Sequence, residues 1–143
     1  MLTKENLIGR WQLIAAEMTI ADKMTDSFDP NREMIKHFTE SGHFYFYSKT
    51  ADRVPFSASV TDEERLAASK TLDTGGGRFT LEGETYTEWV EFCSYPNYEG
   101  KAISFSLSLD GDTLTQQGPY PLRMLGFAEQ DGYVKEVYKR IEK

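Results

Sequence analysis

The sequence predicts an all-β protein, an antiparallel up-and-down β-barrel of about eight strands with one short helix. Three observations lead to this fold class. Aromatic residues, which favour strands, are frequent, with 2 Trp, 8 Tyr and 9 Phe among 143 residues. Short apolar runs recur between turn signals, and residues 102–109 alternate between apolar side chains and serine. The chain contains no repeat, linker or low-complexity tract, so we expect a single domain over residues 1–143.

The first half of the chain is expected to contribute three strands and the helix. A strand over residues 7–18 follows about one helical turn, and a polar segment ends in the turn Asp29-Pro30-Asn31. Strands at 34–39 and 43–48 flank a three-residue loop in which Gly42 takes the positive φ. Thr61 and Glu64 form a capping box, so a short helix begins there.

The second half is expected to contain two hairpins and a last strand. Residues 78–81 and 84–93 form one hairpin around Glu82-Gly83, and residues 102–109 and 113–117 form the other. An irregular segment precedes the last strand at 134–141. Gly75-Gly76-Gly77 is not a phosphate-binding loop, because no Lys-Ser/Thr pair follows and the next segment is a strand.

The charge balance and the single cysteine narrow the function classes. Sixteen Lys+Arg and 23 Asp+Glu give a net charge of −7, and without a basic stripe we expect no nucleic-acid or membrane partner. Cys93 alone forms no internal disulfide, and no apolar run has the length of a signal peptide or a membrane span. We therefore expect a cytoplasmic protein.

Period-2 alternation assigns faces in the hairpin around Glu82-Gly83. The more apolar face, which we expect to point inward, carries Phe79, Leu81, Tyr86, Glu88, Val90 and Phe92. Cys93 then points outward. If Glu88 is buried, it needs a donor or a raised pKa. If Glu88 lies at a barrel rim, water satisfies it.

For the hairpin over residues 34–48, the sequence does not decide which face points into the barrel. One face carries Ile35, His37, Thr39, His43, Tyr45 and Tyr47, and the other carries Met34, Lys36, Phe38, Phe44 and Phe46. The first alternative places histidine and tyrosine in the interior. The second places them on the surface.

Residues near the two ends of the chain resemble the pattern of a known family. Gly9-Arg10-Trp11 lies on the first expected strand, and Arg140 ends the last one. This combination resembles the calycin superfamily of lipocalins and fatty-acid-binding proteins, whose signature is G-x-W with an arginine over the indole. The resemblance implies that Trp11 and Arg140 close one end of the barrel.

Further motifs, in this order, are similar to those of bacterial lipocalin-like domains. They are Phe38-Thr39-Glu40-Ser41-Gly42-His43, Glu63-Glu64-Arg65-Leu66-Ala67-Ala68, Gly75-Gly76-Gly77-Arg78-Phe79 and Tyr86-Thr87-Glu88. The lipocalin disulfide is absent and the second lipocalin motif is not obvious, so secretion and retinol-type transport are not implied.

A barrel of this size holds one small ligand or is filled by side chains. We expect it to bind a small, mostly apolar or aromatic molecule. The expected ligand-binding residues are Tyr45, Tyr47, Phe79, Tyr86, Glu88, Phe105, Gln116 and Tyr138. The alternative is a cofactor-independent isomerase, cyclase or dehydratase, with Glu88 and either Tyr86 or His37 as acid and base. A third alternative is a structural protein with a filled barrel.

No cofactor or metal is expected in any of these alternatives. His37 and His43 would need a third ligand to hold a metal ion. The expected partner is a small molecule, and a homodimer is left open.

Overall fold

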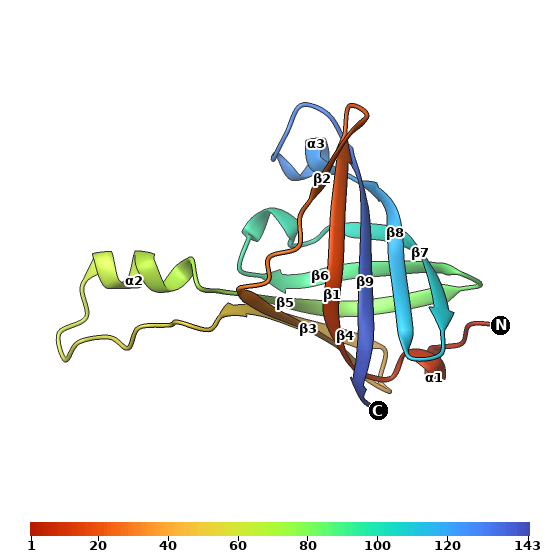
Figure 1. Ribbon diagram of the computed structural model, residues 1–143, viewed down its shortest axis with the longest axis horizontal. Coiled ribbons are helices and arrows are strands. Elements are labelled where there is room, and N and C mark those ends of the chain that lie inside the picture. The colour runs from red at the N-terminus through yellow and green to blue at the C-terminus, as the bar shows by residue number, and fades with distance from the viewer.

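Eight antiparallel strands close into a barrel in the computed structural model, which describes residues 1–143 (Figure 1). The closure comes from β9, which pairs with both β8 and β1. The barrel strands are β1 (Gly9–Ile20), β3 (Arg32–Phe38), β4 (His43–Thr50), β5 (Leu72–Glu82), β6 (Thr85–Cys93), β7 (Ala102–Asp110), β8 (Thr113–Tyr120) and β9 (Gly132–Glu142). The predicted all-β barrel is confirmed.

The other elements are short and lie at the barrel's ends or outside it. The helices are α1 (Lys4–Leu7), α2 (Asp62–Ser69), α3 (Leu122–Leu125) and the 3-10 turn η1 (Pro96–Tyr98). A ninth strand, β2 (Lys23–Asp26), pairs only with β1, within the segment predicted as a polar loop. None of the helices combines the length and apolar character needed to cross a membrane.

Residues 51–71 leave the barrel as an arm that carries α2 (Figure 1). The predicted capping box starts this helix: Glu64 N–H donates to the Thr61 hydroxyl, and the Glu64 carboxylate accepts from the Thr61 N–H at 2.9 Å. These bonds satisfy amide groups that the first turn of a helix leaves free.

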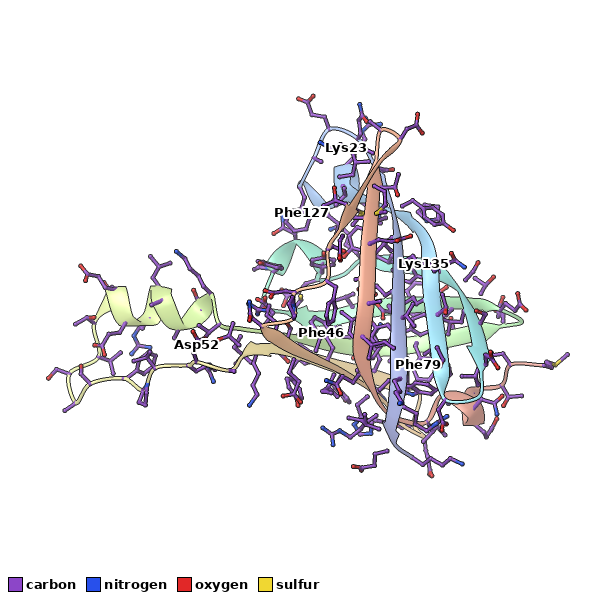
Figure 2. The ribbon with its side chains drawn as sticks, viewed as in Figure 1. Lys23, Phe46, Asp52, Phe79, Phe127 and Lys135 are labelled. Atoms are coloured by element: carbon purple, nitrogen blue, oxygen red, sulfur yellow. The ribbon has the colours of Figure 1, made fainter.

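The alternation of buried and exposed residues in β7 shows which face of this strand points into the barrel. Ile103, Phe105 and Leu107 are buried, while the serines between them are exposed. The strands β1, β8 and β9 cross over β3, β4, β5 and β6 (Figure 1), and side chains fill the space between the two layers (Figure 2). The core therefore lies inside the barrel.

The hairpin of β3 and β4 has the predicted register, with Phe38 opposite Phe44 and Gly42 at a φ of +84°. Its inner face carries Lys36, Phe38 and Phe44, all buried. Burying two phenylalanine rings favours this face strongly.

The alternative that placed His37, Tyr45 and Tyr47 at the cavity is therefore wrong. His37 and Tyr45 are exposed on the outside of the barrel. The half-buried Tyr47 donates its hydroxyl hydrogen to Glu33, with the oxygens 3.3 Å apart, also on the outside.

The hairpin of β5 and β6 turns at Gly83-Glu84, one residue later than predicted, with Gly83 at a φ of +62°. Leu81 consequently pairs with Tyr86. The change moves each partner by two residues, so both strands keep the predicted faces as far as Val90.

A β-bulge after Val90 then reverses the alternation. Gly77 pairs with Val90 and Gly76 with Phe92, which leaves Glu91 without a partner. Phe92 is therefore 43% exposed and Cys93 faces the interior, the opposite of the predicted placement. A side chain at Gly77 would overlap the Trp89 carbonyl oxygen, so the bulge needs glycine there.

Trp11 and Arg140 close one end of the barrel, as the resemblance implied. The Arg140 guanidinium lies 4.2 Å from the centre of the indole ring, and Trp11 is fully buried. The indole N–H donates to the Leu7 carbonyl oxygen at 2.8 Å, and Arg140 donates to that of Ile8 at 2.9 Å. These contacts hold α1 beneath the barrel.

Candidate functional site

A cavity of about 230 Å³ occupies the barrel away from the Trp11 end. Its wall is largely apolar, with Phe44, Phe46 and Phe105 among the lining residues. Exposed Ser94 and Tyr95 lie at its mouth. Phe46 lies near the point where the arm of residues 51–71 leaves the barrel, and Phe79 lies toward the opposite end of the barrel (Figure 2).

Lys36 occupies the base of this cavity and is only 3% exposed. Its Nζ lies 2.7 Å from Glu88 Oε2 and donates to Gln116 Oε1 at 3.0 Å. The same nitrogen lies 5.4 to 6.0 Å from the centres of four aromatic rings, those of Tyr138, Tyr86, Phe38 and Phe44. A carboxylate and aromatic faces therefore both stabilise the buried ammonium.

The Glu88 side chain is 12% exposed, and its carboxylate has the partners that a largely buried carboxylate requires. Its Oε2 accepts from Lys36 and also from the Tyr86 hydroxyl at 2.6 Å. Burial and the neighbouring Glu88 carboxylate raise the pKa of Tyr86 well above its usual range. Tyr86 therefore stays protonated and acts as a donor.

Glu136, on β9, also lines the cavity with its carboxyl group. Its Oε1 accepts from the Tyr138 hydroxyl at 3.0 Å and from Gln116 Nε2 at 3.4 Å. Burial raises the pKa of Glu136, while Lys36 and Tyr138 oppose that rise. Glu136 forms no ion pair, in contrast to Glu88.

Two tyrosines contribute hydroxyl groups to the wall. The hydroxyl oxygens of Tyr98, in η1, and Tyr120, at the end of β8, are 2.5 Å apart. Burial raises the pKa of both phenols, so they remain protonated at neutral pH. Their hydroxyl groups are polar atoms in an otherwise aromatic part of the wall.

Four of the predicted ligand-binding residues line the cavity, namely Glu88, Phe105, Gln116 and Tyr138. Phe79 and Tyr86 lie in the core outside the lining. His37, Tyr45 and Tyr47 are outside the barrel, as described above. The acid and base combination of Glu88 with His37 is therefore not assembled.

Lys36 and Glu136 were missed by the sequence prediction of the site. Lys36 alternates with Phe38 on the face that proved to be the inner one. Glu136 lies two residues before Tyr138, which was placed inside correctly. Alternation in the last strand would have found Glu136.

The residues of this site do not favour nucleophilic catalysis by Cys93 or the binding of a metal ion. Burial raises the pKa of the Cys93 thiol, which disfavours the nucleophilic thiolate. The structure contains no group of three or more His, Cys, Asp or Glu side chains suited to hold a metal ion.

The raised pKa of Glu136 gives a stability prediction. A carboxyl with a higher pKa in the folded chain favours folding in its protonated form. This contribution is complete below the ordinary value of 4.5 and is lost as pH rises through the folded pKa. Glu136→Gln should therefore raise the Tm relative to the unmodified protein, and the difference should grow as the pH rises above the ordinary value of 4.5.

Thermal unfolding followed by circular dichroism at a series of pH values checks this prediction. Glu91→Gln is the matched control, because Glu91 is exposed on the outside of β6. A Tm difference for Glu136→Gln that stays constant with pH would show that Glu136 is not held in an unfavourable environment.

Comparisons with known proteins support the fold. No protein-family model matches the chain, and no curated protein matches its sequence. The structure is similar to a lipocalin-like protein from Bacteroides uniformis, with a TM-score of 0.51 and 16% identity over 95% of this chain and 99% of that one. It is also similar to an uncharacterized protein from Bacteroides eggerthii, with a TM-score of 0.50 and 14% identity over 94% and 98% of the two chains.

A biogenic amine-binding protein aligns with a TM-score of 0.49 and 13% identity, over 99% of this chain and 68% of that one. The two Bacteroides structures, together with the closed eight-stranded barrel, show that the fold is lipocalin-like.

Proposed function

We propose that this lipocalin-like barrel binds a small, largely apolar or aromatic molecule in its central cavity. The observation that carries the proposal is the cavity of about 230 Å³ between an apolar wall and a polar base. An engineered apolar cavity of about 150 Å³ is large enough to bind benzene. A single aromatic ring with a short substituent therefore fits this site.

The pairing of Glu88 favours binding over catalysis. Glu88 is held by Lys36 and Tyr86, and a carboxylate with two strong partners is poorly placed to accept a further proton. A polar base of this kind orients a ligand through its remaining hydrogen-bonding atoms.

A cofactor-independent acid and base enzyme is the second candidate, and one observation favours it. Glu136 lines the cavity, has a raised pKa and forms no ion pair. Carboxyl groups with these properties are frequent in active sites. Chemical turnover of a bound compound that disappears in Glu136→Gln would favour this candidate over simple binding.

Titration with benzyl alcohol, followed by amide NMR, tests the proposed function. We expect saturable shifts at amides around the cavity. Ile103→Trp fills the cavity and should weaken binding by at least about tenfold, a loss of about 1.4 kcal/mol. Val90→Phe is a second, smaller filling variant, in case the larger side chain disturbs folding.

Ala102→Trp is the matched control, because Ala102 precedes Ile103 on β7 and is exposed on the outer face. It adds the same side chain outside the cavity and should leave binding unchanged. Equal affinity in the filled and control variants would place the ligand elsewhere and contradict the proposal.

A further inference from the structure

The charges that line the cavity are almost all paired. Four lining residues carry formal charge: Lys36, Asp73, Glu88 and Glu136. Lys36 and Glu88 neutralise each other at 2.7 Å, and Asp73 pairs with Arg32 at 3.2 Å near the mouth. Glu136 is left as the single lining carboxyl group without a cationic partner.

The hydrogen bonds of Glu136 leave one of its oxygens available. Both Tyr138 and Gln116 donate to Oε1, and Oε2 receives no hydrogen bond from the protein. Glu136 is half-buried, and a carboxylate that is partly removed from water without a counter-ion is unfavourable. A ligand that brings a positive charge would supply the missing partner.

The surroundings of Glu136 also favour a cation over an anion. Tyr98, Tyr120, Tyr138 and Phe105 line the same cavity, and aromatic faces attract positive charge. The one lysine in the lining is already engaged by Glu88 and Gln116. The net charge of −7 gives the whole molecule a field that draws cations toward it.

From these contacts we infer that the cavity selects a small aromatic or apolar ligand carrying a basic nitrogen, which binds as a cation beside Glu136 Oε2. This inference rests on the proposed function and names the class of ligand. The ring of the ligand lies against the apolar wall, and the ammonium group donates to the carboxylate.

Binding of the cation is coupled to the ionisation of Glu136. The other titratable groups that line the cavity are Lys36, Asp73, Glu88, Cys93, Tyr95, Tyr98, Tyr120 and Tyr138, and Tyr86 lies in the core beside Glu88. Burial raises the pKa of the Cys93 thiol and of the phenols of Tyr86, Tyr98, Tyr120 and Tyr138, so these groups keep their protons near neutral pH. Because a primary amine stays protonated in this range, its affinity should rise with pH as Glu136 ionises.

The test compares three molecules of similar size by amide NMR titration: benzylamine, benzyl alcohol and benzoate. A charge-assisted hydrogen bond contributes enough for benzylamine to bind about tenfold to a hundredfold more tightly than benzyl alcohol. Benzoate should bind most weakly. Glu136→Gln should bring the affinities of benzylamine and benzyl alcohol close together, whereas Glu91→Gln should keep the preference.

The outcomes separate this inference from the proposed function. If benzyl alcohol binds in the cavity but benzylamine gains nothing, or keeps its advantage in Glu136→Gln, the inferred ligand class is wrong and the binding function stands. Tighter binding of benzoate would likewise overturn the inference. If none of the three molecules shifts the amides around the cavity, both the inference and the proposed function fail.

Discussion

Trp11→Ala is expected to lower the free energy of unfolding by ~3–5 kcal/mol, the range for removing a large buried aromatic side chain. Trp11 is fully buried where β1, α1 and β9 meet. The substitution removes the indole contact with the Arg140 guanidinium at 4.2 Å and the hydrogen bond to the Leu7 carbonyl. The end of the barrel would lose its main packing group and the anchor of α1.

The protein's second tryptophan provides a matched control. Trp89 is 50% exposed on the outside of β6, so Trp89→Ala should change stability by less than about 1 kcal/mol. Urea unfolding followed by far-ultraviolet circular dichroism measures both variants without relying on tryptophan fluorescence. Similar losses for the two variants would contradict the closing role of Trp11.

Lys36→Met is expected to be comparably damaging, with a loss of ~3–5 kcal/mol at neutral pH. Methionine keeps much of the lysine side chain's length and removes its charge. Glu88 would then remain in the interior without its partner at 2.7 Å, and Gln116 would lose a donor. Most of the expected loss comes from that uncompensated carboxylate.

A second substitution distinguishes this cause from simple loss of packing. In the double variant Lys36→Met with Glu88→Leu, no charge of the pair is left buried, so most of the lost stability should return. Lys135→Met controls for removal of a lysine, since Lys135 is exposed on the outside of β9 (Figure 2). A double variant as unstable as Lys36→Met alone would show that the pair is not the source of the effect.

Much of the barrel could be predicted because its strands obey local rules. The alternation of Ile103, Phe105 and Leu107 with serine identifies an inner face without any knowledge of the neighbouring strands. The pairing of Trp11 with Arg140 followed from the family resemblance. The strand β2 escaped prediction because Lys23, Thr25 and Asp26 are polar and the strand is fully exposed.

The sequence predicts the wrong strand face, or none, where the alternation of apolar and polar residues is interrupted or ambiguous. The bulge at Glu91 depends on the pairing of β6 with the glycines of β5, and it exchanges the faces of Phe92 and Cys93. Both faces of the β3–β4 hairpin contain aromatic residues, so composition alone did not select one of them. The choice depends on contacts between strands that are distant in the sequence.

The polar base of the cavity illustrates such a contact. Lys36 and Glu88 are 52 residues apart in the sequence and adjacent in space. A lysine in a strand normally points outward, and here the Glu88 carboxylate on β6 makes the interior position of Lys36 favourable. Glu88 was identified as needing a donor, but the donor itself could be found only from the closed barrel.

The location of a bound ligand shows whether the cavity is the binding site. Intermolecular nuclear Overhauser effects between the ring protons of benzylamine and the protein's methyl groups would measure it. We predict contacts with the methyl groups of Ile103 and Val90, which line the cavity. Contacts confined to exposed side chains such as Ile14 and Leu66 would place the ligand on the surface and contradict binding in the cavity.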